Sequence, residues 1–142
     1  MSPEVDPAAS WDADNLPLRA AHQVEVAVEW FERAFGALLD AHHEVGHGQE
    51  MLVEAADALD RAGHPELARR ARSEVAARNA AAGRWTYQVL DEFRAHLLEP
   101  VRAFEEEVRG RLTGGVRHRA EALSKREVAG PDARTTVELP ED

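Results

Sequence analysis

The chain has 142 residues, no cysteine and a formal net charge of −10, from 27 acidic against 17 basic side chains. The missing cysteines exclude disulfides, zinc–thiolate sites and iron–sulfur clusters, and the acidic balance argues against nucleic acid or an anionic membrane as a partner. Since no apolar run approaches the roughly 18–20 residues of a membrane span and the first residues lack the apolar core of a signal peptide, we expect one cytoplasmic domain.

Hydrophobic periodicity predicts a helical domain between a short arm and a short tail. Residues 1–14 are rich in proline, aspartate and alanine without periodicity, which indicates a mobile acidic arm. Residues 129–142 share this character and indicate a disordered tail. The domain, residues 15–128, is predicted to contain three helices at about residues 16–61, 65–112 and 116–128.

The first predicted helix has clear start and stop signals. Asp14 or Asn15 is a suitable N-cap, and Pro17 lies in the first turn, where a missing N–H is harmless. No further proline interrupts the helix, and apolar side chains recur at spacings of three, four and seven residues. Gly63 then ends the helix, and Pro65 begins the next one.

The second predicted helix contains Pro100. This residue cannot donate a hydrogen bond and leaves the carbonyl of His96 without its helical donor, so we expect a kink there. The helix ends at Thr113-Gly114-Gly115, and the short third helix that follows has a weak apolar face.

The short turn between the two long helices predicts an all-α fold, a long antiparallel helical hairpin with a short third helix. The turn fixes the pairing, in which the numbers of facing residues add to about 126–128. Leu59 then faces Leu67, and Phe35 faces Phe93, so apolar positions meet along the pair.

Two helices cannot cover both sides of their own apolar stripes, so the sequence predicts a homodimer that forms a four-helix bundle. The residues that we expect at this interface are Trp30, Arg84, Trp85, Leu90 and Leu98. In an alternative, Gly46 and Gly48 break the first helix, and the monomer folds back as a compact bundle.

The stretch Ala41–Glu50 contains three histidines and two glycines in the middle of the first helix. The pairing places His42 across from Trp85 and Thr86, and Gln49 across from Arg78 and Asn79. One interpretation is a buried polar layer that fixes the register of the two helices, as in coiled coils. The other is a ligand pocket. Both interpretations use His42, Gln49, Asn79, Thr86 and Tyr87.

The same stretch offers a second, metal-binding hypothesis. His43 and His47 are four residues apart and share a helical face that Glu50 continues, which suits a divalent transition metal. These side chains project away from the apolar stripe, however, and the E-x-x-H spacing of Glu44 and His47 has no second copy, which a di-iron bundle needs. We therefore expect no cofactor and keep the metal as an alternative.

No feature of the sequence predicts catalysis. The chain has no nucleophile elbow and no glycine-rich phosphate loop after a strand. The sequence predicts a non-enzymatic structural or protein-interaction role, with a second copy or an unidentified protein as partner. The alternative is a ligand- or transition-metal-binding bundle that uses the polar layer.

Overall fold

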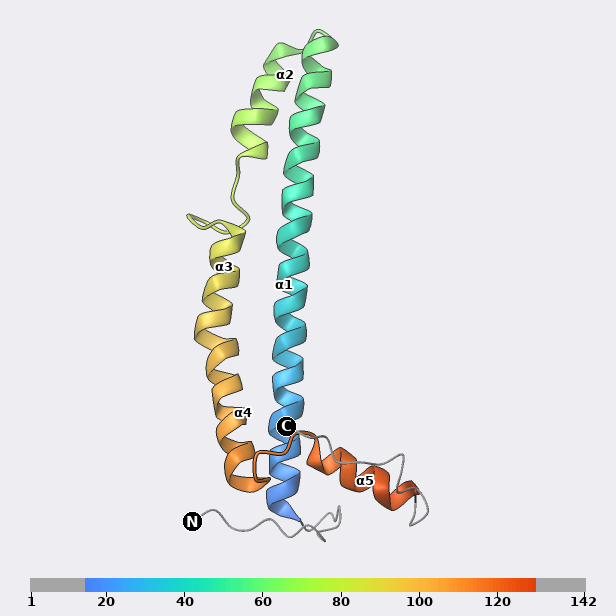
Figure 1. Cartoon of the computed structure of the whole chain (residues 1–142). Coiled ribbons are helices and arrows are strands. Elements are labelled where there is room, and N and C mark those ends of the chain that lie inside the picture. The colour runs from blue at the N-terminus through green and yellow to red at the C-terminus, as the bar shows by residue number, and fades with distance from the viewer. Residues whose placement is uncertain (1–14, 130–142) are drawn as a thin grey trace. The chain divides into compact units, whose positions relative to one another are not determined.

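The computed structural model describes residues 15–129, and this part of the chain is all-α, as the sequence predicts (Figure 1). Within these residues no helix is both long enough and apolar enough to cross a membrane. The predicted arm, residues 1–14, lies outside the described residues, as does the predicted tail apart from its first residue.

The chain divides into two compact units. The first, which we call the terminal unit, combines residues up to Glu32 with those from Leu97 onward. The second, the central unit, comprises Arg33–His96. Each unit is described by itself below.

Helix α1 (Leu16–Arg61) begins where the sequence predicts. Its N-cap is Asn15, whose side-chain Oδ1 accepts a hydrogen bond from the N–H of Leu18 at 3.3 Å. The helix continues through Gly46 and Gly48 without interruption. The alternative in which these glycines break the first helix is therefore wrong.

A glycine turn ends α1. Gly63 has a φ of +84°, which a side chain would disfavour. The N–H of His64 donates to the carbonyl of Leu59 at 2.9 Å, and that of Gly63 donates to Asp60 at 3.1 Å, which together form a Schellman motif. Helix α2 (Pro65–Arg70) then begins at its proline.

The second predicted helix, 65–112, is not one helix, and this is the main correction to the sequence-based fold. Its parts after α2 are a π-helical segment at Ala71–Ala76, a non-helical break at residues 77–85, α3 (Thr86–Phe93), a second π-helical segment at Arg94–Leu98 and α4 (Glu99–Leu112). The apolar stripe resumes after the break with nearly the same spacing, so periodicity alone did not reveal it.

The break at residues 77–85 has a local cause. It contains no large apolar side chain before Trp85, so little packing holds a helix there, and Gly83 adopts a φ of +68°. Helix α3 then starts afresh, because the side-chain Oε1 of Gln88 accepts a hydrogen bond from the N–H of Trp85 at 2.9 Å.

At Pro100 the sequence predicts a kink, and the structure has a π-helical segment, Arg94–Leu98, just before it. Helix α4 restarts at Glu99, so that Pro100 occupies the first turn, where its missing N–H is tolerated. The wider π turn accommodates the irregular hydrogen bonding that the proline imposes.

The third predicted helix, 116–128, is α5 (Arg119–Ala129). It begins later than predicted because Gly114, Gly115 and His118 all have a positive φ. Thr113 stabilises the turn before α5, because its hydroxyl lies within hydrogen-bonding distance, 3.0 Å, of the carbonyl oxygens of both Arg109 and Val116.

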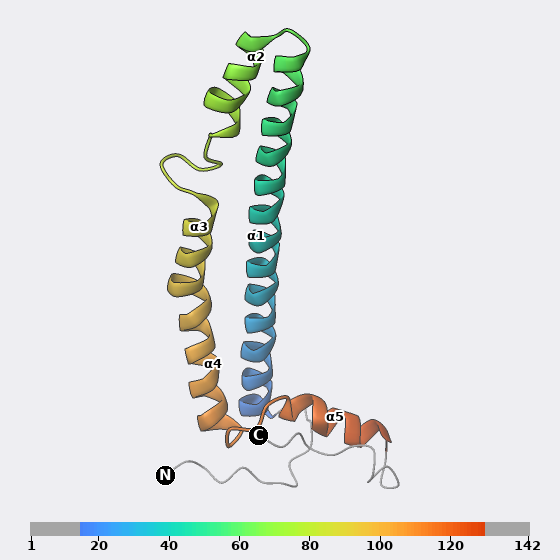
Figure 2. The same cartoon turned by 45° about the horizontal axis from the view of Figure 1, so that its top comes forward.

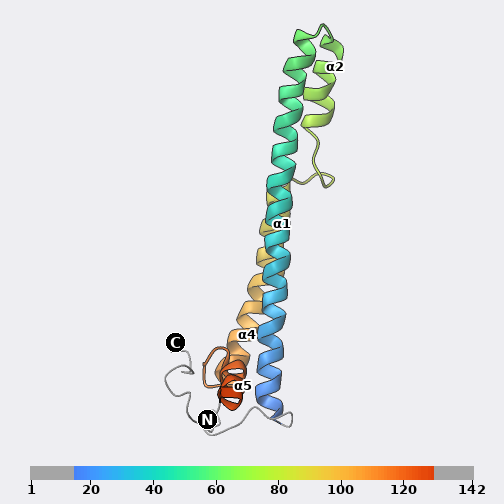
Figure 3. The same cartoon turned by 90° about the vertical axis from the view of Figure 1, so that its right-hand side faces the viewer.

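The terminal unit has a small core where α5 packs on the beginning of α1 (Figure 3). Leu18, Ala120 and Leu123 form one buried cluster. Leu98, before α4, is 1% exposed. Arg102 of α4 binds the carboxylate of Glu32 in α1 at 3.1 Å.

The central unit buries fewer apolar residues than the terminal unit does. Helices α2 and α3 run beside its part of α1 (Figure 2), and Phe35 stacks on Phe93 with ring centroids 6.1 Å apart. The numbers of these two residues add to 128, within the predicted pairing. The buried apolar residues of this unit are Ala56, Ala68, Ala76 and Leu90.

Candidate functional site

The five residues that the sequence assigns to a polar layer or ligand site line one pocket of the central unit, which we call the His42 pocket. Its volume is about 120 Å³. Its lining residues are His42, Val45, Gly46, Gln49, Asn79, Ala80, Trp85, Thr86 and Tyr87. Helix α1 supplies the first four, while the break and the first residues of α3 supply the others.

Two hydrogen bonds join the walls of the His42 pocket. Nδ1 of His42 and Oγ1 of Thr86 share a hydrogen bond of 2.5 Å, between residues that the pairing places opposite each other. The amide of Gln49 donates to the backbone carbonyl of Arg78 at 3.0 Å, one of the two residues that the pairing places opposite it, rather than to the side chain of Asn79. Gln49 therefore supplies a donor to the non-helical break, where backbone carbonyls lose their helical partners.

The two glycines beside the pocket do not serve close helix contact. A Cβ placed on Gly46 or Gly48 would meet nothing within 4 Å. Because they have no side chain, both glycines instead leave open space beside the helix. Gly46 itself lines the pocket.

The residues of the metal alternative lie on the outside of α1. Nδ1 of His47 is 3.6 Å from Oε2 of Glu50, and these side chains are 79% and 76% exposed. His43 is also exposed. Among residues 15–129, no third ligand converges on this pair, so the geometry offers no support for a metal there.

The predicted interface residues separate into two groups. Trp30 and Trp85 are each 62% exposed, and Arg84 pairs with Glu92 on the surface. Leu90 and Leu98 are only 6% and 1% exposed, so little of either side chain is accessible to a second copy in this structure.

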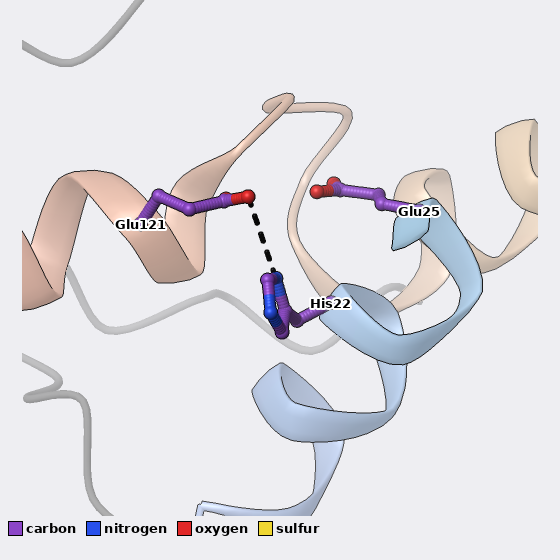
Figure 4. Close-up of side chains that lie close together, drawn as sticks. All are labelled: His22, Glu25 and Glu121. Carbon is purple, nitrogen blue, oxygen red and sulfur yellow. Dashed lines mark ion pairs between the residues drawn. The ribbon is translucent and has the colours of Figure 1, made fainter. Parts of the chain in front are cut away.

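A second polar cluster, in the terminal unit, escaped the sequence analysis. It consists of His22 and Glu25 on α1 with His118 and Glu121 at the start of α5, and we call it the His22 cluster. Nδ1 of His22 lies 3.5 Å from Oε1 of Glu121. Nδ1 of His118 lies 3.6 Å from both Oε2 of Glu25 and Oε1 of Glu121. Figure 4 shows the carboxylates of Glu25 and Glu121 directed toward each other beside the ring of His22.

The sequence does contain a signal for this cluster. Both pairs have the spacing His-x-x-Glu, which places two ligands on one helical face. His22 lies outside the main apolar stripe, and His118 lies in the short basic run Arg117–Arg119. The sequence pattern therefore does not predict that the two histidines lie close together. Their meeting depends on the glycine turn before α5, which brings together residues 93 positions apart.

Glu25 is the buried member of the His22 cluster, at 8% exposure. Burial is the main cause that raises its pKa above the ordinary value, because a charged carboxylate loses solvation there. A hydrogen bond from the backbone N–H of His118 to Oε1, at 3.2 Å, acts in the opposite direction. Oε2 of Glu25 is buried and accepts no hydrogen bond.

The described residues form an all-α protein with one polar cluster in each of its two units. No protein-family model matches this chain, and no curated protein or solved structure matches it either. Its function is therefore inferred from its own residues.

Proposed function

We propose that this chain is a non-enzymatic helical interaction protein whose central unit forms an antiparallel hairpin and pairs with a second copy as a four-helix bundle. One observation carries this proposal. Apart from Leu90, the central unit buries only alanines. Its large apolar side chains that remain exposed are Leu39, Met51, Val53, Leu67, Val75, Trp85 and Tyr87.

Two adjacent helices form a single layer, and a stable domain needs a second layer to bury apolar side chains. The terminal unit has α5 as a cover over the first turns of α1, with a cluster of three buried residues beneath it. In the central unit, α2 and α3 follow one another along its part of α1, and no further helix of this unit covers them. A second hairpin would supply the missing layer.

The charge distribution favours a second copy as this partner. Between residues 40 and 60, α1 has six acidic and no Lys or Arg side chains. Residues 65–84 have five arginines against two acids. Within one chain Arg72 already pairs with Asp57 and Asp60. A two-fold axis would add contacts between the acidic stretch of one copy and the arginine-rich stretch of the other. The central unit as a whole has a net charge of only −2, so repulsion between copies is small.

One flank of α1 is the best candidate for the contact face. Leu39, Gly46 and Val53 are seven residues apart, so they lie along one side of the helix. Val53 and Val75 are 45% and 48% exposed, and their numbers add to 128, like those of Phe35 and Phe93. Both valines therefore occupy paired positions with open side chains.

Substitution with glutamate tests this face. Val53→Glu places a charge on the proposed contact, while Met51→Glu is a matched control, because residues two apart in a helix point about 160° away from each other. Met51 is 68% exposed, so its change leaves the monomer intact. Light scattering should give a dimer for the unmodified chain and for Met51→Glu, and a monomer for Val53→Glu.

Two results would contradict the proposal. If Val53→Glu stays dimeric, the contact lies on another face. If all three proteins are monomers at micromolar concentration, the second layer is not another copy of the chain. Circular dichroism of each variant confirms that the helices are intact before the masses are compared.

The His42 pocket supports a second candidate function, binding of a small polar ligand. The observation that favours it is that His42, Asn79 and Tyr87 line one open pocket beside the glycine at position 46. Native mass spectrometry of the purified chain should then show a bound small molecule that Thr86→Val, which lacks the hydroxyl bonded to His42, releases. A chain free of any added mass would refute this candidate.

A further inference from the structure

We propose that His22, Glu25 and Glu121 bind one divalent first-row transition metal ion. This inference does not depend on the dimer, because all three residues belong to the terminal unit. Each side chain offers one ligand atom, and these atoms lie within 4.8 Å of one another. Among the described residues, these three form the group of histidine and carboxylate side chains whose ligand atoms lie close enough together to share one ion.

The distances suit such an ion. Ligand atoms at 2.0–2.2 Å from a tetrahedral metal are about 3.4 Å apart. The separation between Nδ1 of His22 and Oε1 of Glu121 is 3.5 Å, close to this value. The ligand atom of Glu25 lies within 4.8 Å of those of His22 and Glu121, and its carboxylate faces that of Glu121 (Figure 4).

The donor chemistry selects the class of metal. Two carboxylates neutralise the charge of a divalent ion, and an imidazole nitrogen favours zinc, iron, copper or nickel over magnesium and calcium. Three protein ligands also leave a fourth position open for water or another molecule.

The burial of Glu25 is an independent observation that points to a cation. Its side chain is 9% exposed, and Oε2 is buried without a hydrogen-bond donor. A buried carboxylate oxygen with no donor is unfavourable, and a metal ion would supply the missing partner. The neighbouring pocket is rich in carboxylates, because Glu29, Glu32 and Glu105 line it together with Glu25, and Arg117 and His118 complete its charged lining.

His118 acts as a positioning residue for these ligands. Its N–H donates to Oε1 of Glu25, and its ring lies 3.6 Å from both carboxylates. The φ of His118 is +51°, a conformation that aims its N–H and its ring at α1 together. Groups that hold metal-binding carboxylates in place commonly tune the affinity of such sites.

Isothermal titration calorimetry with zinc chloride tests the proposal on the full-length chain after treatment with a chelator. One zinc ion should bind per chain with a dissociation constant in the micromolar range or below, and zinc should raise the melting temperature of the chain. Glu121→Gln and His22→Gln should each weaken zinc binding at least tenfold. Glu121 is 46% and His22 is 30% exposed in the side chain, so the fold should tolerate both changes.

The exposed pair on α1 provides the control. The double variant His43→Ala, His47→Ala should bind zinc as the unmodified chain does. The proposal fails if this variant loses the zinc signal, if Glu121→Gln and His22→Gln leave it unchanged, or if the unmodified chain binds no zinc. Displacement of the bound zinc by a millimolar excess of magnesium would also contradict the proposal, since the imidazole ligand predicts a preference for a transition metal.

Discussion

Three glycines, two within α1 and one after it, occupy backbone conformations of opposite kinds. Gly46 and Gly48 are helical, with open space around them. Gly63 has a left-handed φ of +84° at the end of the helix. The same substitution should therefore have opposite effects at the two places.

Gly48→Ala should stabilise the folded chain by about 1 kcal/mol, because alanine is the better helix former and its Cβ meets no neighbour. Gly63→Ala should destabilise it by about 1–2 kcal/mol, because alanine is strained at a left-handed φ. Urea denaturation at one fixed chain concentration measures both. A loss of stability in Gly48→Ala would reveal a contact that this account lacks.

The buried carboxyl of Glu25 should make stability depend on pH. Its raised pKa means that the folded chain holds this proton more tightly than the unfolded chain does. The contribution of the Glu25 carboxyl to the free energy of unfolding is therefore fully present below its ordinary pKa of 4.5, and it is lost as the pH rises through the raised pKa. Glu25→Gln cannot ionise and avoids this loss.

With a chelator present, Glu25→Gln should match the unmodified chain near pH 4 and be more stable at pH 7. Thermal unfolding across this range provides the comparison. Equal stability of the two proteins at every pH would show that the burial of Glu25 carries no penalty. A penalty with no structural benefit is typical of a residue retained for binding.

At the scale of elements, the start of α3 depends on one side chain. Gln88→Ala removes the acceptor for the N–H of Trp85 and should destabilise the chain by about 1 kcal/mol. Gln88→Glu is the matched control, because its carboxylate can accept the same bond and suits a helix N-terminus. Urea denaturation should separate the two variants. Equal losses would mean that the cap contributes nothing.

How far the sequence predicts these elements depends on how local the signals are. The limits of α1 follow from Asn15 and Gly63, which act on adjacent backbone groups. The break at residues 77–85 was missed because its alanines favour a helix by themselves, and only the absence of large packing residues opposes that tendency.

The candidate sites follow the same rule. The sequence predicts that His42 lies opposite Thr86 because one short turn sets the predicted pairing, and these two side chains do share a hydrogen bond. The His22 cluster was missed because the position of His118 depends on a glycine turn and on contacts between residues distant in sequence. No periodic pattern encodes such a contact.

At the scale of the whole molecule, the two units differ in how completely they bury their apolar side chains. Both units leave large apolar side chains exposed, but the terminal unit buries Leu18, Val28, Leu98 and Leu123, whereas Leu90 is the one large apolar side chain that the central unit buries. Exposed apolar side chains in this number indicate a surface that another molecule covers. Self-association through the central unit, as proposed above, would cover these side chains.

Sedimentation equilibrium of the unmodified chain tests that claim most directly. At micromolar concentration the account predicts a species of twice the chain mass of 15.7 kDa, which dissociates on dilution. A single species of 15.7 kDa over the whole concentration range would contradict it.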